Sequence, residues 1–266
     1  MRNTFLPRWQ DNSLPSEYNL SYEEVNFYSK DKLKLKGWLI LKDKGFPTIV
    51  LCHGLGTNKS DLLGIAEFIY NADFNLFLFD FRGHGESQGR TTSFGYLEQR
   101  DLEGAIDYIF ARSDLENKNL GVFGLSLGGA VAIMVAAKDS RIKAVISDSS
   151  YKGLYSSMVH HARFLYGFPK FPFNVFLRLT YFLRFGIDPK KISPQEVIAQ
   201  ISPYPVFILN GEKDLQIPKE NAEVLFEKAK PPKELWIIPG AGHGEGYGIY
   251  FEEYQRRIIE FFRKNL

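Results

Sequence analysis

The stretch Gly124-Leu125-Ser126-Leu127-Gly128-Gly129 constrains the fold of this chain more than any other. It follows the apolar run 120–123 and precedes the Ala-rich run 130–137, an order that predicts a strand, a sharp turn and a helix. A serine at the centre of such a turn is typical of a nucleophile elbow. Glycine fits on both sides because a side chain there would collide with the neighbouring backbone. A tight turn without a catalytic role fits the same pattern. The catalytic interpretation therefore requires a base and an acid that can act together with Ser126.

Composition limits the class of protein. The 266 residues include 44% apolar and 24% charged residues, enough for one large α/β domain or two small ones. A net charge of +2 gives no case for nucleic acid as a partner, and the single cysteine, Cys52, cannot form an internal disulfide. Cysteines do not cluster, and we expect no metal and no cofactor. Without a signal-like or membrane-spanning stretch, we expect a cytoplasmic protein unless a leader or anchor has been removed.

Strands and helices alternate along most of the chain. Residues 25–42 predict two antiparallel strands, and continuous apolar runs predict buried strands at 48–52, 76–79, 120–123, 142–147, 206–209 and 235–238. Helical spacing predicts helices at 61–70, 96–110, 130–137 and 220–229, and a last one that carries Tyr254, Ile258 and Phe261. This alternation favours a mostly parallel sheet with right-handed crossovers. It stops between 151 and about 202, so that segment is predicted to be an insertion between two strands of one sheet.

A serine nucleophile needs a base within hydrogen-bonding distance. His243 lies in a glycine-rich loop after the strand predicted at 235–238, at the carboxyl edge where catalytic groups gather. We therefore expect His243 to be the base. His53 is the main rival, although it ends the strand that should supply an oxyanion donor. His84 is interpreted as a structural imidazole in the turn 82–85.

The base needs an acid to orient it. Asp214 follows the strand predicted at 206–209 and is the preferred candidate. Asp148, which follows the strand after the nucleophile, competes with it because it faces the same edge. The order Ser126, Asp214, His243 is the one expected of this architecture. The backbone N–H groups of Leu55, in a glycine-flanked loop, and of Leu127 are the predicted oxyanion donors.

These motifs resemble those of the α/β-hydrolase superfamily, in particular its serine esterases and monoacylglycerol-lipase-like members. The ordered set is His53-Gly54-Leu55-Gly56, Asp80-Phe81-Arg82-Gly83-His84-Gly85-Glu86-Ser87, the Ser126 elbow, Asn210-Gly211-Glu212-Lys213-Asp214 and Gly242-His243. The resemblance implies an eight-stranded, mostly parallel sheet flanked by helices, with a helical cap inserted after the sixth strand. We therefore expect an N-terminal arm at 1–21, a hydrolase core at 22–150 and 203–266, and a cap at 151–202. The resemblance also implies the triad and the oxyanion donors named above.

The expected cap is rich in aromatic and basic residues. The aromatic residues predict an apolar acyl or aryl pocket, and Tyr151, Tyr155, Phe164 and Phe168 are its candidate substrate-binding residues. Many of them fit a purely structural role in holding the cap to the sheet equally well. The basic residues are compatible with transient contact with an anionic membrane surface, with solvated side chains as the simpler interpretation.

The sequence thus predicts a serine carboxylesterase or lipase-like enzyme that acts on a small hydrophobic ester. A thioesterase, or an amidase or peptidase, with the same triad is the first alternative. A weakly catalytic ligand-binding protein of the same fold is the second.

Overall fold

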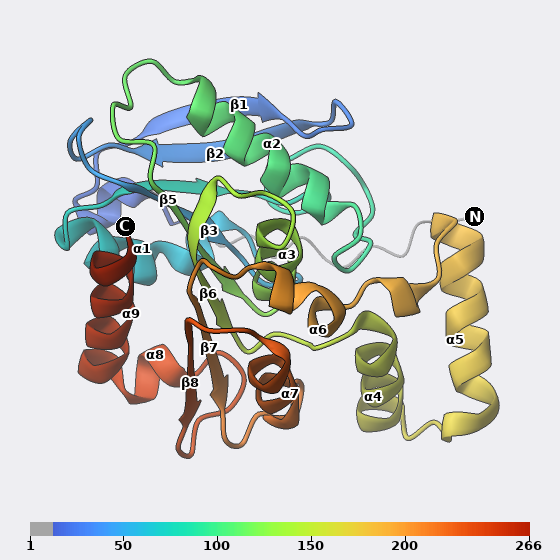
Figure 1. Ribbon diagram of the computed structural model, residues 1–266. Helices are drawn as coiled ribbons and strands as arrows, with labels where there is room; N and C mark the ends of the chain where they lie inside the picture. The colour runs from blue at the N-terminus through green and yellow to red at the C-terminus, as the bar shows by residue number, and fades with distance from the viewer. Residues whose placement is uncertain (1–12) are drawn as a thin grey trace.

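The predicted apolar runs form the strands of one eight-stranded sheet in the computed structural model, which describes residues 13–266. The strands are β1 (Glu23–Tyr28), β2 (Lys34–Ile40), β3 (Thr48–Cys52), β4 (Asn75–Phe79), β5 (Leu120–Leu125), β6 (Ile142–Asp148), β7 (Val206–Gly211) and β8 (Lys233–Ile238). They lie in the order β1-β2-β4-β3-β5-β6-β7-β8 (Figure 1). Strand β2 pairs antiparallel with β1 and β4, and the other neighbours are parallel. The predicted mostly parallel sheet is confirmed.

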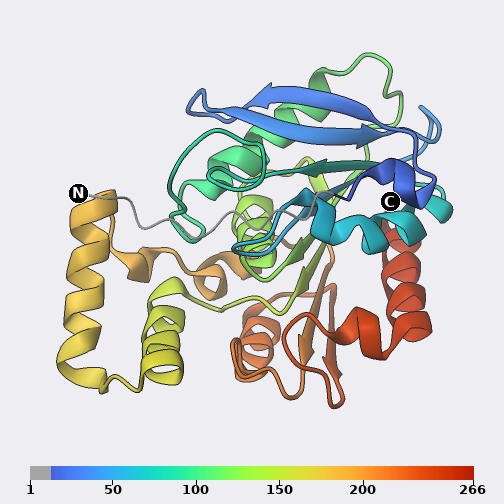
Figure 2. The same cartoon turned by 180° about the vertical axis from the view of Figure 1, so that it is seen from behind.

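Helices cover both faces of this sheet (Figures 1 and 2). Helices α1 (Leu63–Asn71) and α9 (Phe251–Asn265) pack on one face, and α2 (Glu98–Ala111), α3 (Leu127–Ala136) and α7 (Glu220–Lys228) pack on the other. The short helix α8 (Gly246–Ile249) leads into α9, and the 3₁₀ turn η2 (Lys59–Leu62) leads into α1. In α9 the predicted residues Tyr254, Ile258 and Phe261 are all buried. Their helical spacing therefore marks the face that packs on the sheet.

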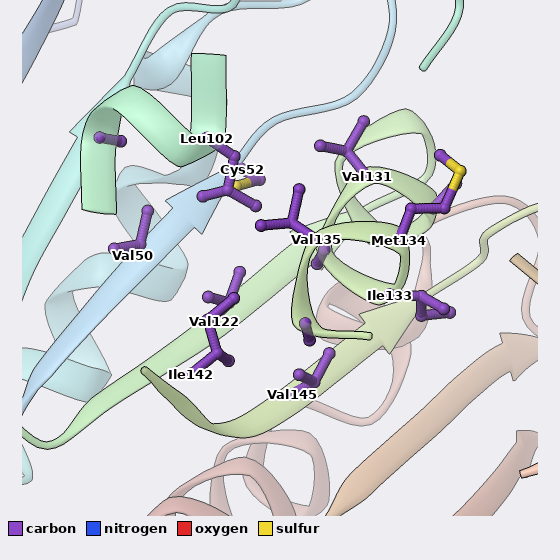
Figure 3. Packing of buried hydrophobic residues seen from close by; sticks show 14 of the residues in the cluster. Val50, Cys52, Leu102, Val122, Val131, Ile133, Met134, Val135, Ile142 and Val145 are labelled. Atoms are coloured by element: carbon purple, nitrogen blue, oxygen red, sulfur yellow. The ribbon is translucent and has the colours of Figure 1, made fainter. Parts of the chain in front are cut away.

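The core beneath α3 explains the Ala-rich run after the elbow. Every residue of α3 is buried, and Figure 3 shows Val131 and Val135 of this helix over Val122 of β5, with Leu102 of α2 beside them. Small side chains let the helix approach the sheet closely. That approach places the N-terminus of α3, and with it Ser126, firmly at the sheet edge.

The segment between β6 and β7 holds the inserted helices that the resemblance implied. They are α4 (Leu154–Tyr166), α5 (Lys170–Phe185), η3 (Pro189–Lys191), α6 (Pro194–Val197) and η4 (Ile198–Gln200). Both views show α5 at the margin of the molecule, with α4 between it and the sheet (Figures 1 and 2). Within residues 13–266, no helix combines the length and the apolar character needed to cross a bilayer.

The expected N-terminal arm falls partly outside the described residues, which begin at Ser13. Its end forms the 3₁₀ turn η1 (Pro15–Tyr18). Pro15 and Leu20 are buried, and Leu20 belongs to the core shared by α1 and α9. Pro15 and Leu20 thus anchor this segment to the core, while Leu14, Ser16, Glu17 and Asn19 remain exposed.

Candidate active site

The turn between β5 and α3 holds Ser126 in a backbone conformation that few residues adopt. Its φ of 53° and ψ of −111° carry a strain of about 1–3 kcal/mol. The Ser126 N–H donates to the Asp148 carbonyl at 2.8 Å, which fixes the turn from the neighbouring strand. The flanking glycines are required, since a Cβ at Gly124 would lie 2.4 Å from the Gly128 backbone and one at Gly128 would lie 2.1 Å from the Cys52 carbonyl oxygen.

Three predicted residues meet at the carboxyl edge of the sheet. The His243 Nε2 lies 3.0 Å from the Ser126 Oγ, and its Nδ1 lies 2.7 Å from the Asp214 Oδ2. Ser126 follows β5, Asp214 follows β7 and His243 follows β8, so parallel strands deliver all three to one edge. These distances meet the geometric requirements for a nucleophile, a base and an orienting acid.

The surroundings of Asp214 determine which way its carboxylate points. Its side chain is fully buried, and its Oδ1 accepts the N–H groups of Gln216 at 2.9 Å and Ile217 at 2.8 Å. The Oδ2 is therefore left to accept the Nδ1–H of His243. With the proton of the neutral imidazole on Nδ1, Nε2 is free to accept the hydroxyl proton of Ser126.

The two rival histidines have structural surroundings. His53 is buried, its Nδ1 donates to the Gly54 carbonyl at 2.7 Å and its Nε2 accepts the Phe81 N–H at 3.0 Å. Burial lowers the pKa of His53 to about 3, so this ring stays neutral. The Nδ1 of His84 donates to the Arg82 carbonyl at 2.9 Å, within the turn that the sequence assigned to it. Neither geometry places an imidazole against Ser126.

The rival acid Asp148 has other hydrogen-bond partners. Its Oδ2 accepts the Tyr254 hydroxyl at 2.7 Å and its Oδ1 accepts the Ser149 hydroxyl at 2.8 Å. Burial raises the pKa of Asp148. The Ser149 Oγ in turn accepts the N–H of Gly244 at 3.3 Å. Asp148 thus supports the loop that carries His243, whereas Asp214 contacts the imidazole itself.

The predicted oxyanion donors lie on the two sides of the serine. Leu55 and Leu127 both line the cavity that contains Ser126. The loop that carries Leu55 adjoins the elbow, since a Cβ at Gly54 would lie 3.6 Å from the Ser126 Cβ. Leu127 is the first residue of α3, where a backbone N–H has no acceptor within the helix. Both positions suit amides that bind a negatively charged oxygen.

A buried ion pair fixes the loop that carries Leu55. The Lys59 Nζ donates to the Asp80 Oδ2 at 2.8 Å, and the Lys59 N–H donates to the Asp80 Oδ1 at 2.9 Å. Burial opposes ionisation of Asp80, yet the Lys59 ammonium holds the pKa of this carboxyl below its ordinary value. The pair connects the end of the loop to the turn that follows β4.

Lys59→Met should lower the free energy of unfolding by about 3–5 kcal/mol, because it leaves the Asp80 carboxylate buried without its cation. Urea denaturation measures this change. Lys44→Met is the matched control, since Lys44 and its partner Glu116 are both exposed, and it should have a much smaller effect. Equal losses in the two variants would contradict the structural role of the buried pair.

A cavity of about 690 Å³ surrounds Ser126 and His243 and reaches under the cap. Of the four cap residues predicted to bind substrate, Tyr151 lines this cavity, and Tyr155, Phe164 and Phe168 do not. The orientation of α4 accounts for Tyr155 and Phe164, because the residues of this helix that line the cavity include Leu154, Met158, His161 and Leu165, which share one side of it. Phe164 instead stacks on His160, and Phe168 on Phe173. Of these four residues, Tyr151 alone lies against the cavity, and its role in binding substrate remains a prediction.

Several lining residues were not predicted from the sequence. They include Thr57, Phe94, Met158, His161 and Gln216. The spacing of Met158 and His161 could have indicated them, since Leu154, Met158 and His161 follow one another at intervals of four and three residues and so share one side of a helix. Thr57 and Gln216 follow the oxyanion loop and the acid, and adjacency to those motifs could have indicated them. Burial lowers the pKa of His161, which favours the neutral imidazole.

Comparison with known proteins identifies the family to which this chain belongs. The chain matches the family model described as the alpha/beta hydrolase fold over residues 47–182, more than half of its length. The protein belongs to the α/β-hydrolase family. This α/β-hydrolase is 31% identical to the uncharacterized protein YfhR of Escherichia coli K12, over 91% of this chain and 80% of that one. It is 29% identical to protein bem46 of Schizosaccharomyces pombe, over 88% of this chain and 76% of that one.

A solved structure is also similar over nearly the whole α/β-hydrolase. The esterase Pf2001 of Pyrococcus furiosus superimposes with a TM-score of 0.82 and 25% sequence identity, covering 97% of this chain and 98% of the other. The predicted fold, including the helical insertion after the sixth strand, is confirmed.

Proposed function

We propose that this α/β-hydrolase is a serine esterase that cleaves hydrophobic carboxylic esters through an acyl-enzyme. The observation that carries the proposal is the continuous hydrogen-bonded series from Asp214 through His243 to Ser126, which opens into a cavity large enough for a substrate. Similarity to an esterase of Pyrococcus furiosus supports hydrolytic activity in general.

The geometry suits acylation of Ser126. His243 Nε2 accepts the hydroxyl proton while the Ser126 Oγ attacks the ester carbonyl carbon. The carbonyl oxygen becomes an alkoxide, which the N–H groups of Leu55 and Leu127 stabilise. The ester C–O bond then breaks, and the imidazolium returns its proton to the departing alcohol. Each backbone donor of this kind lowers the barrier by about 3 kcal/mol.

Deacylation repeats these steps with water as the nucleophile. His243 removes a proton from the water, the hydroxide oxygen attacks the acyl carbon, and the bond to the Ser126 Oγ breaks. The proton on the imidazole then returns to the serine oxygen. The buried Asp214 carboxylate stabilises the imidazolium in both halves of the reaction.

The cavity lining supports a hydrophobic acyl group. Apolar side chains dominate the part under the cap, with Phe94, Leu154, Met158, Leu165 and Ile217 among them. Burial of each methylene group contributes about 0.8 kcal/mol. This contribution predicts that kcat/KM rises by about fourfold for each methylene that enters the cavity.

Hydrolysis of p-nitrophenyl esters from acetate to laurate tests this proposal. We expect kcat/KM to be higher for medium-chain esters than for acetate. Met158→Trp, which fills the cavity, should reduce medium-chain activity by about tenfold and affect acetate less. Phe164→Trp is the matched control on the same helix, because Phe164 lies outside the lining. Activity on acetate alone would contradict the acyl pocket, and activity on thioesters or amides alone would contradict the esterase.

A further inference from the structure

The outer surface of the cap exposes an unusual number of large apolar side chains. On α5 these are Phe171, Val175, Phe176, Leu179, Phe182 and Leu183, between about half and three-quarters exposed. Leu165 and Tyr166 at the end of α4 are exposed as well. We call these eight residues the cap face. Extended apolar patches of this kind mark surfaces that bind another molecule or a membrane.

Helix α5 is apolar on two opposite sides. Tyr181 faces inward, is buried and donates its hydroxyl to the Ser93 carbonyl at 2.7 Å, which anchors the helix to the core. Val175, Leu179 and Phe182 recur every three to four residues on the outward side. A helix with apolar residues on two opposite sides is most stable with an apolar environment on each of them. The core of the protein provides this environment on the inward side of α5 only.

The net charge of the cap helps to choose between a second copy of the chain and a lipid surface as the partner of the cap face. Between residues 151 and 202 the chain has seven Lys and Arg residues and two acidic residues, Asp188, which pairs with Arg178, and Glu196, which pairs with Lys228. A second copy of the chain on this face would bring two strongly cationic caps together. An anionic lipid surface, in contrast, complements the basic side chains while its acyl region accepts the apolar ones.

We propose that the cap face docks on the surface of an anionic lipid bilayer. Phe176 and Leu183 enter the boundary between headgroups and acyl chains, and the surrounding Lys and Arg side chains contact lipid phosphates. Helix α5 then lies in the plane of the interface.

The active-site cavity reaches the cap face at the end of α4. Leu165 and Tyr166 line the cavity and also belong to the cap face. On the proposed function, an ester held in the bilayer reaches Ser126 past these two residues. Docking itself does not depend on catalysis, so the two proposals can fail separately.

Flotation with unilamellar vesicles tests docking, with the Ser126→Ala protein used to prevent turnover. We expect binding to vesicles of phosphatidylcholine with one-third phosphatidylglycerol, weakened by added salt, and little binding to phosphatidylcholine alone. Phe176→Glu combined with Leu183→Glu should weaken binding by about tenfold or more. Tyr28→Glu combined with Ile249→Glu is the control, because Tyr28 in β1 and Ile249 in α8 are also large, exposed side chains but lie outside the cap segment.

Two further measurements keep the outcomes distinct. With Ser126 restored, hydrolysis of a short soluble ester by the Phe176→Glu and Leu183→Glu variant should equal that of the wild type, since neither residue lines the cavity. Vesicle binding that is absent, or that survives the double substitution, would overturn the proposal. Light scattering that shows a dimer dissociated by the same substitutions, without vesicle binding, would assign the cap face to a second copy instead.

Discussion

Ser126→Ala is expected to reduce kcat/KM for a p-nitrophenyl ester by about 10⁵-fold. The substitution removes the Ser126 Oγ, which lies 3.0 Å from His243 Nε2 and is the oxygen that attacks the carbonyl. Steady-state hydrolysis measures the loss. Labelling with a fluorophosphonate should modify one serine per wild-type chain and none in the variant.

The Ser126→Ala protein should fold normally. The serine hydroxyl faces a cavity, and its hydrogen-bond partner within residues 13–266 is His243, so the midpoint of thermal unfolding should stay close to that of the wild type. Ser157→Ala is a matched control, because Ser157 lines the same cavity and its hydroxyl interacts with His161 rather than His243. A folded Ser126→Ala protein with wild-type activity would disprove the nucleophile.

Asp214→Asn should lower kcat by about 10⁴-fold. The two backbone N–H groups of Gln216 and Ile217 would hold the asparagine oxygen where Oδ1 now lies. Its NH₂ group would then face His243 Nδ1 and donate to it, which places the imidazole proton on Nε2. A protonated Nε2 cannot accept the hydroxyl proton of Ser126.

The same experiment decides between the two acids. Asp148→Asn should cost far less activity, because Asp148 bonds to Tyr254 and Ser149 and reaches His243 only through its loop. Steady-state kinetics of the two variants, with circular dichroism to confirm folding, provide the comparison. A larger loss from Asp148→Asn than from Asp214→Asn would reverse the assignment.

The sequence could predict the parts of the site that depend on local chemistry. Gly124 and Gly128 signal the elbow because each close approach excludes a side chain, and continuous apolar runs signal strands buried on both faces. Ser126, Asp214 and His243 each follow a parallel strand, which places all three at one edge of the sheet. The choice between Asp214 and Asp148 could not be made from chain order and strand ends alone, since Asp148 also lies at this edge of the sheet. What separates them is the contact of Asp148 with Tyr254, more than a hundred residues away.

The substrate-binding residues of the cap were harder to predict than the triad, because they too depend on tertiary packing. The aromatic composition of the cap predicts an apolar surface but not which side of each helix faces inward. Phe164 and Leu165 are neighbours, and a turn of about 100° between them directs Leu165 to the cavity and Phe164 away from it. The burial of Leu20 near the N-terminus could not be predicted from the sequence either, because it depends on packing against α1 and α9.

The insertion also has an evolutionary consequence. Strands β6 and β7 are parallel neighbours, so some crossover must connect them, and a dozen residues would suffice. Everything beyond that minimum leaves the register of the sheet untouched, and lengthening a surface connection costs little chain entropy. Descendants of one ancestral hydrolase can therefore diversify this segment by insertion, deletion or recombination while inheriting Ser126, Asp214 and His243 unchanged.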